Sequence, residues 1–183
     1  TRRYSSAASD VYKRQEYSLT LQLLALMTAL TLLPSVVLMM TSFVRIIIVM
    51  SLLRQALGTA QTPPNQVLIG LSLFLTIFIM APIISSVYDD AIKPYSDGEI
   101  SFDAALIEAE APVRSFMLNQ TRETDIAMFA EVANNDDIVE PSDVPFTTLV
   151  PAFITSELKS AFSIGFLIYI PLSLIHISEP TRP

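Results

Sequence analysis

Residues 67–87 read VLIGLSLFLTIFIMAPIISSV, a run of 21 residues without a charged side chain. At a rise of 1.5 Å per residue, a helix of this length is about 31 Å long. The hydrocarbon core of a bilayer is about as thick. The run therefore predicts a membrane-spanning helix, and Pro82, which removes a backbone donor near its end, predicts a kink or a terminus there.

The preceding residues, 19–57, are also mostly apolar. Pro34 predicts a kink or a break within them, so we expect either one bent helix or a short helix followed by a longer one. Gly58 is a suitable residue to end this helix, and Thr62 and Pro63 form an N-cap and first-turn pair that begins the next one. Because the connection is short, the two apolar stretches are expected to pack as an antiparallel hairpin.

An acidic segment follows the hairpin. Residues 88–148 hold fourteen of the eighteen acidic residues and three of the eleven basic ones, a net charge of −11 that leaves +4 for the rest of the chain. Within it, residues 113–133 predict one helix, because residues eleven apart, such as Met117 and Met128, return to the same face. Pro112 fits the first turn of such a helix.

Apolar sequence returns at residues 149–173, where a helix is expected over 152–170. The two ends of the chain differ from everything between them. Residues 1–17 and 174–183 are expected to be non-native or disordered tails, since they resemble translated adapter sequence more than part of a fold.

These segments predict an all-α membrane protein with three parts between the two tails. Long hydrophobic helices form a hairpin over residues 18–87, residues 88–148 form a small acidic helical domain, and one further hydrophobic helix covers 149–173. Arg45 and Arg54 flank the short hairpin turn, so the positive-inside rule places that turn in the cytoplasm and residues 88–148 in the periplasm.

Composition also bounds the chemistry. The chain has no cysteine, one histidine and four scattered glycines. These counts argue against a metal site, a cofactor site, a phosphate-binding loop and a catalytic thiol. We expect no catalytic residues and no enzyme activity, and the absence of a basic stripe argues against nucleic-acid binding.

Four charged residues within apolar sequence are candidates for an assembly interface. Arg45 and Arg54 are each expected either to pair with an acid on a neighbouring subunit or to extend to the cytoplasmic surface, and the position of Arg54 beside the turn favours the surface. Glu157 and Lys159 are two residues apart and cannot face each other on a helix. Their partners are therefore expected on other helices or other subunits, the alternative being a hydrated position at the start of the helix.

Three stretches together resemble the FliP family of flagellar biosynthetic proteins. They are SFVRIIIVMSLLRQALGTAQTPPNQVLIGLSLFLTIFIMAP (42–82), VRSFMLNQTRETDIAMF (113–129) and VPAFITSELKSAFSIGFLIYIP (150–171). With their joining segments they cover residues 19–171. The chain departs from the family at Ser163, where a long polar or basic residue is more usual.

The resemblance implies a pore-forming subunit of the flagellar type III protein export gate in the bacterial inner membrane, at the flagellar basal body. Such a subunit forms a homo-oligomer with other export-gate subunits and passes unfolded flagellar export substrates. Family members continue past residue 171 into a second hydrophobic helix and a methionine-rich loop that seals the closed pore. From that difference we expect the 183-residue chain not to support export by itself.

The alternative function is a subunit of a small-solute transporter or an ion channel. A secondary transporter of that kind is expected to show two halves with matching broken helices. No such pairing is visible in the sequence, which favours the export-gate interpretation.

Overall fold

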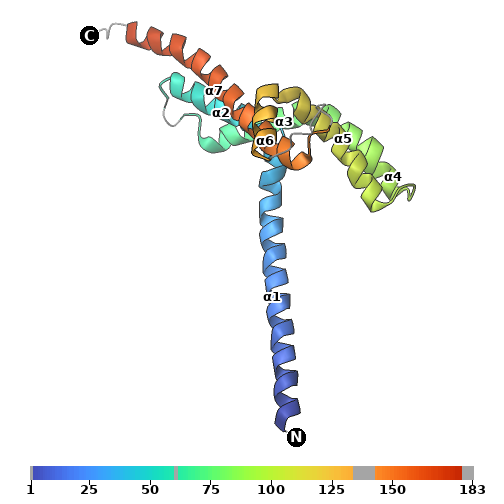
Figure 1. The fold of residues 1–183 in the computed structure, drawn as a ribbon. Coiled ribbons are helices and arrows are strands. Elements are labelled where there is room, and N and C mark those ends of the chain that lie inside the picture. The colour runs from blue at the N-terminus through green and yellow to red at the C-terminus, as the bar shows by residue number, and fades with distance from the viewer. Residues whose placement is uncertain (1, 60–61, 134–142, 179–183) are drawn as a thin grey trace. The chain divides into compact units, whose positions relative to one another are not determined.

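The computed structural model describes residues 2–59, 62–133 and 143–178, and every regular element within them is a helix (Figure 1). The prediction of an all-α fold is confirmed. Three helical stretches are long and apolar enough to cross a membrane: Leu19–Met39, Asn65–Ser96 and Phe146–Leu172. The chain divides into two compact units, Thr1–Val37 and Leu38–Pro183.

The first unit is a single helix. Helix α1, Arg2–Met39, continues through Pro34, so the chain does not break there, and of the two expectations for that proline only a kink remains. Proline is tolerated in membrane helices when neighbouring groups satisfy the backbone carbonyl that it leaves free. The helix also includes residues 2–17, which the sequence had set apart as a tail.

The break occurs instead after Met39, at the start of the second unit. The Thr41 hydroxyl donates to the Leu38 carbonyl at 2.6 Å, and the Phe43 amide donates to the Thr41 hydroxyl at 3.3 Å. A side chain thus takes over backbone hydrogen bonds at this point, which is how Ser and Thr compete with helix geometry. Helix α2, Phe43–Ala56, begins directly afterwards.

Helix α2 and helix α3, Asn65–Val87, pack against each other as the predicted hairpin. Gly58 has a φ of +72°, a left-handed conformation that favours glycine, and its amide donates to the Gln55 carbonyl at 3.0 Å. Helix α3 does not end at Pro82. It runs on through a π-helical turn, η1 (Tyr88–Ile92), into α4, Lys93–Ser96.

Two helices occupy the stretch where one was predicted. Helix α5, Phe102–Gln120, contains Pro112 in its interior, and helix α6, Glu123–Val132, follows after Thr121 and Arg122. The Thr121 hydroxyl donates to the Met117 carbonyl at 2.6 Å, so a threonine again marks the break. Because the chain turns here, Met117 is fully buried while Met128 is 41% exposed, and the predicted common face does not exist.

Helix α7, Phe146–Ser178, contains both Pro151 and Pro171. It begins before the expected residue 152 and extends into the segment that had been read as a tail. Arg114 of α5 fixes its start: the guanidinium donates to the Val144 carbonyl at 2.5 Å and lies 5.6 Å from the centre of the Phe146 ring. The adjoining core consists of Met117, Val144, Leu149 and Phe153.

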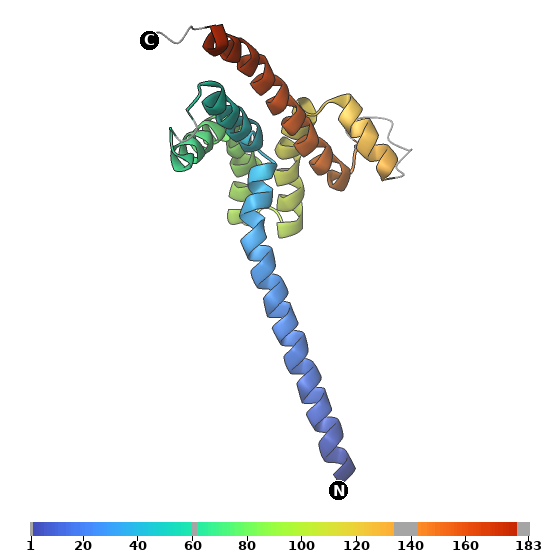
Figure 2. The same ribbon diagram turned by 90° about the vertical axis from the view of Figure 1, so that its left-hand side faces the viewer.

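Helices α2 and α7 lie side by side, as both views show (Figures 1 and 2). Contacts join Arg45 to Glu157 near one end and Leu52 to Gly165 farther along. Residue numbers rise together along both helices, so α2 and α7 run parallel. Since α3 returns antiparallel to α2, α7 begins on the side of the unit where α3 ends.

The outer surfaces of α3 and α7 are apolar. On α3 the buried residues recur every four positions and form one stripe, Leu68, Ser72, Thr76 and Met80. Large apolar side chains elsewhere on the two helices are exposed, and among them are Phe74, Ile77, Phe78, Phe162, Phe166 and Leu167. An exposed apolar surface of this extent is typical of helices in contact with lipid or with other membrane subunits.

Candidate functional site

A group of polar and charged side chains lies around the middle of α7, where the helix is otherwise apolar. We call this group the polar layer, and it consists of Arg45, Gln120, Asp125, Ser156, Glu157 and Lys159. Its members come from α2, α5, α6 and α7. Residues far apart in the sequence therefore meet at one level of the second unit.

Glu157 is a deeply buried charge of the polar layer, with 1% of its side chain exposed. It forms an ion pair with Arg45 of α2. The terminal nitrogen that contacts Glu157, Nη2, also donates to Oε1 of Gln120 at 3.1 Å. One arginine thus joins α2 to α7 and to the C-terminal end of α5.

Lys159 forms the second ion pair, with Asp125 in the first turn of α6. The two partners differ in exposure: Asp125 is 1% exposed and Lys159 is 48% exposed. A carboxylate in the first turn of a helix is also favoured by the positive end of the helix dipole. Lys159 therefore neutralises a buried acid while about half of its own side chain is exposed.

Ser156 ties α7 to the break between α5 and α6. Its hydroxyl, fully buried, accepts a hydrogen bond from the Arg122 amide at 3.0 Å. The Arg122 amide lies at the N-cap of α6, where backbone donors lack helical partners. The serine supplies the missing acceptor, which explains why the helix breaks at this position rather than elsewhere.

The two ion pairs balance each other's charge, so the polar layer carries no net charge. Both acids still have one oxygen, Oδ2 of Asp125 and Oε2 of Glu157, without a hydrogen-bond partner in the described part of the chain. Removing one member of a buried pair typically costs about 3–5 kcal/mol, because the other charge is left uncompensated. Loss of Arg45 or of Lys159 is therefore expected to be tolerated poorly, because each loss leaves a buried carboxylate without its cation.

Arg54 lies apart from the polar layer, at the end of α2. Its Nη1 donates to the Pro63 carbonyl at 3.2 Å and to Oδ1 of Asn65 at 2.6 Å. The side chain spans the connection between α2 and α3. Arg54 thus has local partners in the turn that it was expected to flank.

The sequence placed Glu157 and Lys159 among candidate residues with partners on other helices or subunits, and the structure gives both a partner on another helix of the same chain. Arg45 was expected to pair across subunits or to reach the surface, and its acid is instead Glu157 of its own chain. A role of the four candidates in assembly stays a prediction.

Sequence reasoning missed Gln120, Asp125 and Ser156. All three lie inside the motifs that carry the family resemblance, NQTRETD and TSELK. Their position inside these motifs was the signal by which the sequence could have identified them. Their pairing was not visible, because it joins residues more than thirty positions apart.

Comparison with known proteins agrees with this architecture. The model of the FliP family matches residues 26–178. The match passes residue 171, where the resemblance had been expected to end, and reaches the last residue of α7. It therefore includes part of the segment that the sequence had suggested was foreign.

Curated relatives give the same result. The chain is 55% identical over 163 residues to the flagellar biosynthetic protein FliP of Pectobacterium carotovorum subsp. carotovorum, which covers 89% of the chain and 63% of the relative. It is 54% identical to that of Cereibacter sphaeroides, over 87% of the chain and 53% of the relative. It is 48% identical to that of Bacillus subtilis (strain 168), over 88% of the chain and 73% of the relative.

The chain thus spans a little over half to about three quarters of the length of these relatives. The family match covers most of the chain and includes every residue of the polar layer. The chain belongs to the FliP family.

Proposed function

We propose that this protein is a pore-forming subunit of the flagellar type III protein export gate, which passes unfolded flagellar subunits across the inner membrane. The observation that carries the proposal is the match to the FliP family over residues 26–178, a region that contains helices long enough to cross a membrane. The relatives are named flagellar biosynthetic proteins. Its role is structural, since the polar layer connects α2, α5, α6 and α7 to one another.

The membrane concerned is the bacterial inner membrane at the flagellar basal body. With the α2–α3 turn in the cytoplasm, α3 ends on the periplasmic side, and residues 88–148 lie there. The parallel course of α2 and α7 places the start of α7 on the same side as the end of α3, so residues 88–148 begin and end on one side. Arg54 in the turn supports this orientation through the positive-inside rule.

The protein acts as one member of a homo-oligomer that also contains other export-gate subunits. The exposed apolar side chains of α3 and α7 supply surfaces for contact with these neighbours and with lipid. The polar layer fixes how α7 stands against α2 and α6, so that the outer face of α7 is presented in one orientation. Arg45, Glu157 and Lys159 then affect assembly through the conformation of the subunit.

A chimera tests this function. In the Pectobacterium relative, the aligned region is replaced by the corresponding residues of this chain and expressed in a strain that lacks its own FliP. We expect flagellar subunits in the culture medium and copurification of the chimera with other gate subunits. A chimera that reaches the membrane at the normal level, yet neither exports nor copurifies, would contradict the proposal.

A further inference from the structure

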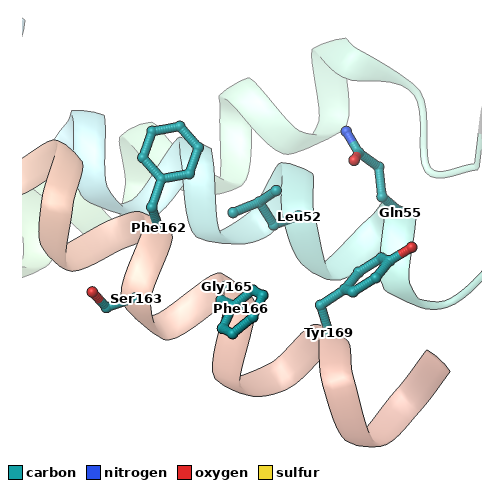
Figure 3. Close-up of a pocket in the computed structure, with 7 residues that line it drawn as sticks. All are labelled: Leu52, Gln55, Phe162, Ser163, Gly165, Phe166 and Tyr169. Atoms are coloured by element: carbon teal, nitrogen blue, oxygen red, sulfur yellow. The ribbon is translucent and has the colours of Figure 1, made fainter. Parts of the chain in front are cut away.

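We draw no further inference here: the strongest candidate, the groove between α2 and α7 that is lined by Leu52, Phe162, Gly165 and Phe166 among others (Figure 3), is an unpartnered apolar surface, and nothing in the structure shows what covers it.

Discussion

Gly165 of α7 is so close to Leu52 of α2 that a Cβ atom added to the glycine would lie 3.1 Å from the leucine Cβ. The contact sets the spacing of the two parallel helices beyond the Arg45–Glu157 ion pair. Small residues allow close packing of membrane helices in this way. The glycine is therefore expected to be needed for shape, since it lies within a helix and has no unusual backbone conformation.

Replacing Gly165 by alanine should force α2 and α7 apart. Inserting a methyl group into a tight contact typically costs about 1–3 kcal/mol. We expect a lower midpoint of thermal unfolding in detergent, followed by circular dichroism. Gly70→Ala is the matched control, because a Cβ at that helical glycine meets no atom within 4 Å. Gly70→Ala should be neutral or slightly stabilising, since alanine is the better helix former.

A second substitution checks the cause of the Gly165 effect. Leu52→Ala combined with Gly165→Ala should recover part of the stability that Gly165→Ala loses, because the clashing side chain is removed. Two substitutions that simply add their separate costs would show that the glycine matters for another reason.

Glu157→Ala should impair the subunit more than loss of an exposed acid. It leaves the Arg45 guanidinium without its acid in a largely apolar setting, and such a loss costs about 3–5 kcal/mol when the pair is buried. The measurement is the yield of the multi-subunit complex from detergent extracts of cells that express the chimera. Glu108→Ala, at an exposed position of α5, is the control. Normal assembly and export by the Glu157→Ala variant would mean that Glu157 lies on a hydrated surface and is not needed for assembly.

The ion pair between Lys159 and Asp125 should respond asymmetrically. Lys159→Met strands a carboxylate that is 1% exposed, whereas Asp125→Asn leaves a lysine that is 48% exposed and can turn toward water. We expect Lys159→Met to lower the free energy of unfolding by about 3–5 kcal/mol and Asp125→Asn by about 1 kcal/mol. Thermal unfolding of the two variants, measured under the same conditions, tests this difference in stability. Equal losses would mean that the buried environment of Asp125 has been misjudged.

The orientation in the membrane is tested by enzyme fusions. Alkaline phosphatase is active only after export, so a fusion near Asp136 should be active and one near Gln61 inactive. Both sites lie outside the described residues, between α6 and α7 and between α2 and α3. The reverse pattern would contradict the placement of residues 88–148 in the periplasm.

The apolar runs were sufficient to predict the helical class and the spanning segments, because length and hydrophobicity decide both. Helix breaks were predicted less well. Reasoning from prolines placed a kink or a break at Pro34. The chain breaks instead at Thr41 and again at Thr121, where a hydroxyl bonds to a carbonyl of the preceding turn. Proline inside a long apolar helix costs one hydrogen bond, and the surrounding helix outweighs that cost.

The sequence predicted two residues of the candidate site but not their partners. Glu157 and Lys159 stood out because charges in apolar helices need partners. The identity of those partners, Arg45 and Asp125, depends on how α2 and α6 pack against α7. Spacing along the chain cannot provide that information, because Arg45 and Glu157 are 112 residues apart and Asp125 and Lys159 are 34 residues apart.

The proposed function depends most on the Arg45–Glu157 ion pair, which links α7 to α2 in an export-competent subunit. Charge exchange in the chimera tests it directly, with Arg45→Glu, Glu157→Arg and the double variant compared by the amount of flagellar protein in the culture medium. Each single variant places like charges together and should abolish export, while the double variant restores opposite charges and should recover a substantial part of it. A double variant that exports no better than the worse single variant, or single variants that export normally, would contradict the account.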